Sequence, residues 1–154
     1  MKAIHWIIAA LACVQPAQAA TTDPETLIYR FPGVFDSGDP DNTGVATVFF
    51  CTNFSGVLEN VRIVTRQSNA DIVINKVFAL SHLTTLIAVT HPTFAYSDGG
   101  PSNMATGFIQ GTAAIAATSI NIICTAETID ATTAAPVGVA KRGIRFNPVP
   151  GSQE

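Results

Sequence analysis

The sequence predicts an all-β domain, an immunoglobulin-like β-sandwich of about seven or eight antiparallel strands. Three observations indicate this class. Residues 45–89 alternate apolar and polar side chains with a period of two, and they are rich in β-branched and aromatic types. Turn-forming clusters recur about every 10 to 14 residues, which is close to the spacing of sandwich strands. Beyond the first 19 residues the chain has two cysteines, Cys51 and Cys124, and we expect them to form a disulfide that ties two distant strands across one core.

The first 19 residues have the features of a signal peptide. Lys2 supplies a positive start, residues 4–14 form an apolar run, and the segment ends in the small-x-small pattern that signal peptidase cleaves, here after Ala19. We therefore expect a protein that is secreted or periplasmic. A lipoprotein is the alternative, because the residues before Cys13 loosely resemble a lipobox in which that cysteine carries the lipid. Residues 20–26 predict a disordered entry to the domain.

A single β-sandwich domain is expected over residues 27–147. Its first strand covers residues 27–31 and ends at Pro32 and Gly33, after which residues 36–44 consist of turn-forming types. Four more strands follow, each with period-two alternation. They are expected at residues 45–53, 57–66, 71–78 and 83–90.

The later part of the chain is less sharply patterned. Residues 99–126 carry no charged side chain, but their amide and hydroxyl groups make them too polar for a transmembrane span. The alanines in residues 112–117 leave a helix open, whereas the alternation over residues 120–127 favours two strands in this part. A last strand over residues 137–146 is interrupted by a basic pair and a glycine, and residues 148–154 form a tail.

Four short segments, residues 49–55 (FFCTNFS), 115–119 (IAATS), 123–126 (ICTA) and 144–148 (IRFNP), resemble a recurring group of small secreted bacterial proteins of uncharacterised function. The resemblance spans most of the chain after the signal peptide. It implies an exported, single disulfide-linked β domain, and it transfers no catalytic residue.

Composition and motifs argue against two functional classes. With 11 acidic and 8 basic residues the formal charge is −3, which offers no field for collecting nucleic acid. The chain has no Gly-x-Ser-x-Gly motif and no glycine-rich phosphate loop. A small secreted hydrolase would have to use His91 or His82 as its base, and we keep it as the alternative to a non-enzymatic module.

Two loops are candidates for ligand binding. The first gathers oxygen donors of the kind that Ca²⁺ prefers, although an ordinary solvated turn has the same composition. Its candidate ligands are Asp36, Asp39, Asp41 and Asn42. The second, residues 91–103, contains two prolines and two glycines and is the longest loop, and loops of this length are often functional. Its candidates are His91, Phe94, Tyr96 and Asp98, of which the two aromatic rings could stack on a glycan.

Charge is unevenly distributed along the chain, since acidic residues are concentrated early and Lys141, Arg142 and Arg145 come late. Head-to-tail association would bring these charges together, whereas two solvated patches on a monomer are the simpler interpretation. An assembling subunit would also expose an edge strand, either the first strand or residues 144–146. The sequence thus predicts an exported, non-enzymatic module that acts through its surface on a protein, on a glycan or on copies of itself.

Overall fold

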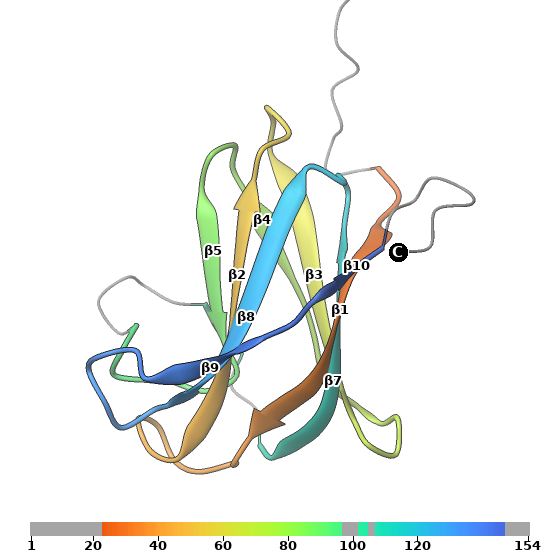
Figure 1. Cartoon of the computed structure of the whole chain (residues 1–154). Coiled ribbons are helices and arrows are strands. Elements are labelled where there is room, and N and C mark those ends of the chain that lie inside the picture. The colour runs from red at the N-terminus through yellow and green to blue at the C-terminus, as the bar shows by residue number, and fades with distance from the viewer. Residues whose placement is uncertain (1–22, 97–101, 105–106, 147–154) are drawn as a thin grey trace, which may run out of the picture.

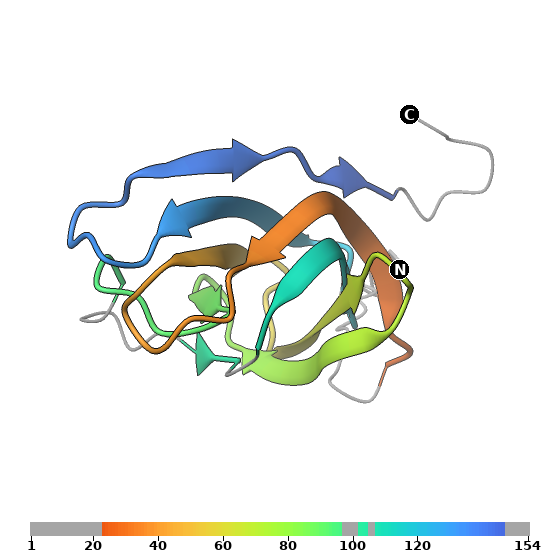
Figure 2. The ribbon, with the colours of Figure 1, turned by 90° about the horizontal axis from the view of Figure 1, so that it is seen from below.

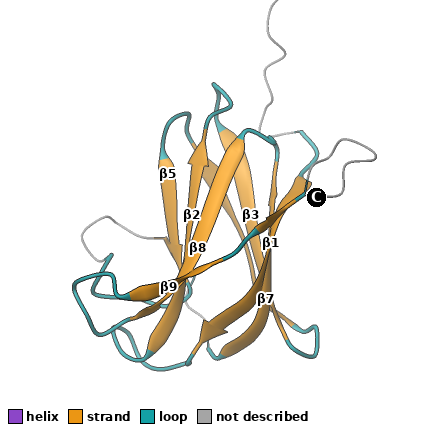
Figure 3. Ribbon diagram, in the orientation of Figure 1, coloured by secondary structure: helices purple, strands orange, loops and turns teal. Residues whose placement is uncertain are grey.

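The computed structural model describes residues 23–96, 102–104 and 107–146, so the expected signal peptide, Asp98 and the expected tail lie outside it. The described chain consists of strands and loops without a helix (Figure 3), and accordingly it contains no helix long and apolar enough to cross a membrane. The strands are β1 (Thr26–Asp36), β2 (Val45–Asn53), β3 (Glu59–Gln67), β4 (Ile72–Leu80), β5 (Thr85–Val89), β6 (Ser102–Asn103), β7 (Ile109–Ala117), β8 (Ile122–Asp130), β9 (Gly138–Lys141) and β10 (Ile144–Arg145).

These strands build a sandwich of two five-stranded sheets, which confirms the predicted all-β class (Figures 1 and 2). Sheet A has the order β10-β1-β7-β3-β4, and sheet B has the order β6-β5-β2-β8-β9. In the described chain, eight strands have four residues or more, while β6 and β10 have two each. The pairing is antiparallel except between β5 and the two-residue β6, which run parallel.

The period-two alternation explains how the sheets enclose the core. In β3, Val61 and Ile63 are fully buried, while Arg62 between them is only partly buried. Across the sandwich, the buried rings of Phe31 from β1 and Phe49 from β2 meet edge to face with centroids 5.9 Å apart. Each such ring contributes about 2 kcal/mol through burial alone, so these inward positions hold the two layers together.

The disulfide forms between the expected cysteines but in a different place. Cys51 and Cys124 are register partners on β2 and β8, with Cα atoms 4.2 Å apart, so the bond joins neighbouring strands of one sheet. The expectation that it would tie two strands across the core is therefore wrong. Sequence spacing reveals which cysteines are available, but not which strands are paired.

β1 is longer than the sequence predicts. Pro32 and Gly33 do not end it, because the strand continues to Asp36 with an irregular register just after Pro32. Proline is tolerated there because β10 pairs with β1 only at Tyr29 and Arg30. At Pro32 no β10 residue lies opposite, so the missing N–H of proline interrupts no hydrogen bond between β1 and β10. β1 pairs with β7 on its other side, so it is not the free edge expected for assembly, whereas β10 does form an edge of sheet A.

The C-terminal strands β9 and β10 connect the two sheets along one side of the sandwich. After β9 at the edge of sheet B, the chain crosses to β10 at the edge of sheet A, as the blue strand segments in Figure 1 show. Residues 112–117 belong to β7, so the helix that their alanines leave open is not formed. The loops between strands lie at two opposite ends of the sandwich, and these ends and the β9–β10 crossing carry the candidate sites.

Candidate functional site

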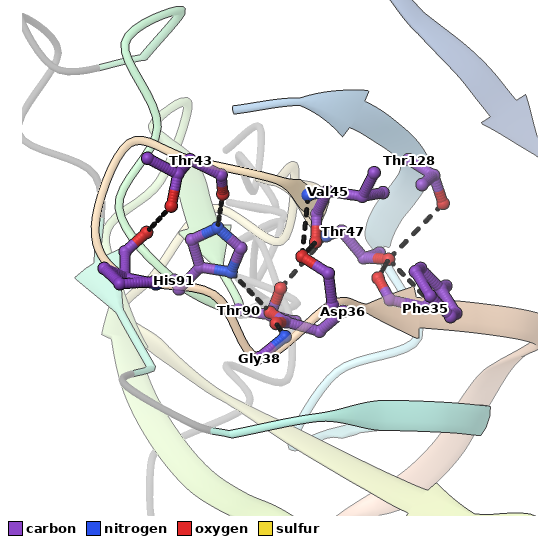
Figure 4. Close-up of polar contacts among 11 residues, drawn as sticks. Phe35, Asp36, Gly38, Thr43, Val45, Thr47, Thr90, His91 and Thr128 are labelled. Atoms are coloured by element: carbon purple, nitrogen blue, oxygen red, sulfur yellow. Dashed lines mark hydrogen bonds and ion pairs between the residues drawn. The ribbon is translucent and has the colours of Figure 1, made fainter. Parts of the chain in front are cut away.

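One end of the sandwich buries a pair of contacting polar side chains, Asp36 and His91, from two segments that the sequence assigns to separate loops. Asp36, at the end of β1, places Oδ2 2.8 Å from Nδ1 of His91, and both side chains are almost wholly buried (Figure 4). The other carboxylate oxygen accepts a hydrogen bond from the N–H of Gly38 at 2.8 Å. Nε2 of His91 lies 2.9 Å from the carbonyl oxygen of Thr43. Both ring nitrogens thus face oxygen acceptors, and the pair links β1 to the segment after β5.

This geometry bears on the hydrolase alternative. A general base needs a ring nitrogen that can reach a nucleophile, and His91 has neither a free nitrogen nor an exposed edge. His82 is exposed, and its Nδ1 accepts a hydrogen bond from the N–H of Gly56 at 3.0 Å. Within the described chain it has no hydrogen bond to a serine or a carboxylate. Neither histidine shows the arrangement of an activated triad.

The expected calcium ligands lie in different surroundings, because Asp36 is buried and the other acidic residues of the loop are exposed. Its carboxylate is committed to His91 and Gly38, while Asp39 and Asp41 are exposed in the β1–β2 loop. Asn42 has a left-handed φ of 60°, a conformation that asparagine tolerates in turns. Among the described residues no three His, Cys, Asp or Glu side chains are grouped so that they could hold a metal ion.

The start of the long loop packs against sheet B. Ala95 and Tyr96 cover a small apolar cluster built on Val48 and its neighbours, and the ring of Tyr96 meets that of Phe50 edge to face at 5.3 Å. The hydroxyl of Tyr96 donates to a carboxylate oxygen of Glu127. Burial, together with this hydrogen bond, raises the pKa of Tyr96 to about 12. The ring is therefore engaged in packing and is not presented as a glycan platform.

Phe94 and the end of the loop also contact neighbouring parts of the domain. Phe94 is half-exposed, and its N–H donates to the carbonyl oxygen of Ala131 at 3.1 Å. The loop also contains β6, which adds a short parallel strand beside β5. The described parts of this segment thus belong to sheet B, because residues 95–96 pack against it and residues 102–103 extend its edge.

The late basic residues meet at a hollow where the chain crosses between the sheets. The hollow has a volume of about 450 Å³ and is lined by Pro32, Arg142, Gly143, Ile144 and Arg145. A methyl group on Gly143 would lie 2.5 Å from the ring of Phe31, so glycine is required for the chain to approach β1 this closely. We call this site the basic hollow.

The cations of the basic hollow differ in their contacts. Arg145 donates to the carbonyl oxygen of Ile120 at 2.7 Å and stacks over the ring of Tyr29 at 5.6 Å. Lys141 lies beside Gly33, close to the rim. Arg142 is exposed and makes no ion pair or hydrogen bond with the described part of the chain. Of the three late cations that the sequence names as an assembly patch, Arg142 and Arg145 thus line the hollow, whereas Lys141 does not.

The opposite end of the sandwich from the β1–β2 loop presents apolar side chains. Three loops that each connect one sheet to the other meet there, at residues 54–58, 81–84 and 118–121, at the top of Figure 1. Each contributes at least one large apolar residue that is about half-exposed or more. We call this set the apolar end: Phe54 (49% exposed), Leu58 (48%), Leu83 (66%) and Ile120 (45%).

Sequence reasoning misses the apolar end because it places three of its four residues in expected strands. Leu58 falls in residues 57–66, Leu83 in residues 83–90 and Ile120 in the alternating segment 120–127. Apolar positions in such segments are interpreted as core, so their exposure becomes evident only when the loops are placed side by side. The available hint is Phe54, because a large apolar residue is an unusual choice for a solvated turn.

Comparison with protein-family models, with curated proteins and with solved structures finds no match to this chain.

Proposed function

We propose that this protein is an exported, non-enzymatic β-sandwich that acts through its surface as an assembly module. In this proposal the basic hollow of one copy receives the acidic β1–β2 loop of the next copy. The signal-peptide pattern of residues 1–19 supports export, and the disulfide suits an oxidising compartment outside the cytoplasm. The burial of His91 is the reason why we do not propose the hydrolase alternative.

The observation that carries the proposal is the unpaired charge of Arg142. This guanidinium lies at the rim of a 450 Å³ hollow, beside Arg145 and Lys141, and no described carboxylate of its own chain neutralises it. Asp39 and Asp41 are exposed and likewise have no ion pair within the described chain. An arginine beside an apolar floor suits a carboxylate, because its planar group donates two parallel hydrogen bonds.

A second copy is the partner that we propose for this hollow, because the same chain presents the basic hollow and the acidic loop at separate places. The acidic loop joins β1 to β2 at one end, whereas the hollow lies at the β9–β10 crossing. Two different surfaces that complement each other give a heterologous contact, which leaves each copy with one free partner surface. Such a contact builds rings or chains rather than closed two-fold dimers.

The solution mass tests this proposal. The exported form is followed by light scattering coupled to size exclusion across a concentration series at low and high salt. We expect a mass that rises with concentration at low salt and falls toward one chain at high salt, because exposed charges are screened. A mass that stays at one chain throughout would overturn the proposal.

Charge reversal identifies the surfaces. Arg142→Glu should abolish the concentration dependence, and the double variant Arg142→Glu with Asp41→Lys should restore it, because the two surfaces are again complementary. Arg66→Glu on β3 is the matched control, since it makes the same charge change outside the hollow. Equal effects of Arg142→Glu and Arg66→Glu would show that net charge, and not the hollow, governs association.

A further inference from the structure

The basic hollow has more room than a single acidic side chain fills. Its volume of about 450 Å³ lies within the range of about 300–1,000 Å³ that is usual for small-molecule sites. An aspartate side chain offers only a carboxylate on one methylene group, so it would occupy a small part of this space. Three of the five lining residues, Pro32, Gly143 and Ile144, have no polar side-chain group. The hollow therefore has space for an apolar group in addition to a carboxylate.

The lining of the hollow is held in place by β1. Gly143 lies against the ring of Phe31, and Arg145 is the register partner of Tyr29 and stacks over its ring. The rings of Tyr29 and Phe31 are both buried and are stacked with centroids 5.9 Å apart. Because this base belongs to the core, a ligand would enter a site that is already formed, and no ordering of the chain would oppose its binding.

The two arginines of the hollow are available to an anion to different degrees. Arg145 already donates to the carbonyl oxygen of Ile120, so it contributes a fixed positive charge to the wall. Arg142 is exposed and makes no ion pair or hydrogen bond with the described part of the chain. Its planar group can therefore donate two parallel hydrogen bonds to a carboxylate. No carboxylate of the described residues lines the hollow, so nothing in its wall repels an anion.

We propose that the basic hollow binds a small ligand that combines a carboxylate with an aliphatic chain of medium length. The carboxylate pairs with Arg142 beside the charge of Arg145, and the chain packs against Pro32 and Ile144. Ile144 is 48% exposed, so a ligand can remove apolar surface of this residue from water. Each methylene group that is fully buried strengthens binding about fourfold. A ligand with both parts should therefore bind more tightly than a ligand with either part alone.

The ligand would also regulate the assembly proposed above. It uses the same guanidinium of Arg142 as the acidic loop of the next copy, so the two cannot occupy the hollow together. A ligand that binds the free hollow draws the equilibrium toward single chains by mass action. The binding itself stands apart from the assembly, and only this regulatory step rests on the proposed function.

Isothermal titration calorimetry of the exported form tests the binding. The probe is octanoate, and acetate and octan-1-ol are comparison probes that each keep one part of it. We expect octanoate to bind about tenfold or more tightly than either of them, and Arg142→Gln to weaken octanoate binding about tenfold or more. Arg142 is exposed and makes no described polar contact, so this variant should keep the melting temperature of the wild type. Arg66→Gln on β3 is the matched control outside the hollow and should leave the affinity unchanged.

Three results would overturn the ligand site. They are no octanoate binding at millimolar concentrations, equal affinity for octanoate and acetate, and equal affinity of the wild type and Arg142→Gln. Light scattering with octanoate added then tests the regulatory step, because the mass should fall toward that of one chain. An assembling protein that binds octanoate and keeps its mass would overturn this step.

The two measurements also separate the ligand site from the assembly. If octanoate binds to a protein that is a single chain at every concentration, the ligand site is supported and the assembly is refuted. If the mass rises with concentration and octanoate does not bind, the ligand site is refuted and the assembly is supported.

Discussion

The buried pair of Asp36 and His91 predicts that two substitutions at one position will differ sharply. Asp36→Ala removes the acceptor for Nδ1 of His91 and for the N–H of Gly38, while the ring remains buried. Leaving a buried polar group without its hydrogen-bond partner costs about 1–3 kcal/mol, so the two groups left by Asp36→Ala cost about 2–6 kcal/mol. That is a large part of the roughly 5–15 kcal/mol that stabilises an ordinary domain. We expect the melting temperature of Asp36→Ala to fall by about 10–20 °C.

Asp36→Asn should lower the stability only slightly, because asparagine can form hydrogen bonds with both His91 and Gly38. The amide oxygen can accept from the N–H of Gly38, and the amide nitrogen can donate to Nδ1 of a neutral ring. The ring then carries its proton on Nε2 and donates it to the carbonyl oxygen of Thr43. The expected loss is at most about 1.5 kcal/mol, the scale of one ordinary hydrogen bond.

Urea denaturation near neutral pH with the disulfide intact measures both free energies of unfolding. Asp39→Ala is the control, because Asp39 is exposed in the same loop and its removal should change stability by less than about 0.5 kcal/mol. If Asp36→Asn and Asp36→Ala were equally destabilised, the pattern of acceptors around the ring would not explain the pair. A loss below about 1 kcal/mol for Asp36→Ala would refute its structural role.

Three further predictions concern other parts of the domain. The pKa of Tyr96 is raised to about 12 from an ordinary value of 10.0, chiefly by burial, so the stabilisation linked to its protonated form is present below about pH 10 and is lost as the pH rises through about 12. Tyr96→Phe should remove this alkaline loss, and Glu127→Gln should lower the absorbance midpoint of the tyrosine only in part; an unchanged midpoint would contradict the contribution of Glu127. Reduction of the Cys51–Cys124 bond, which closes a separation of 73 residues, should lower the free energy of unfolding by about 4 kcal/mol, and a loss below about 1 kcal/mol in denaturant titrations would contradict this estimate. Leu83→Asn should stabilise the domain by about 1 kcal/mol because asparagine tolerates a left-handed φ; the same gain for an exposed leucine elsewhere in the loops would show that the backbone is not strained there.

The sequence predicts the strands well where burial on one face imposes alternation. Residues 45–53 are a clear example, because the same span forms β2 and buries Phe49 and Cys51 in the core. Prediction fails where tertiary pairing overrides a local signal. Pro32 and Gly33 form a turn-like pair, yet β7 continues to pair with β1 beyond them, so the strand persists to Asp36.

The candidate sites show the same division. The late cations were predictable as a group because they are close in sequence, and the β9–β10 crossing places two of them, Arg142 and Arg145, at the basic hollow. The partnership of Asp36 with His91 could not be predicted, because 55 residues separate them and each has an ordinary role in its own loop. The apolar end was equally hidden, since it depends on three loops between the sheets that meet only in the folded domain.

Contact between the basic hollow and the acidic loop is electrostatic, and raising the ionic strength from about 0.01 M to about 1 M shortens the screening length from about 30 Å to about 3 Å. At high salt the wild type should therefore behave as a single chain in solution, and Arg142→Glu should match it. If the wild type still associated at high salt, burial of apolar surface, which salt does not screen, would account for the contact, and its assignment to the basic hollow would be wrong.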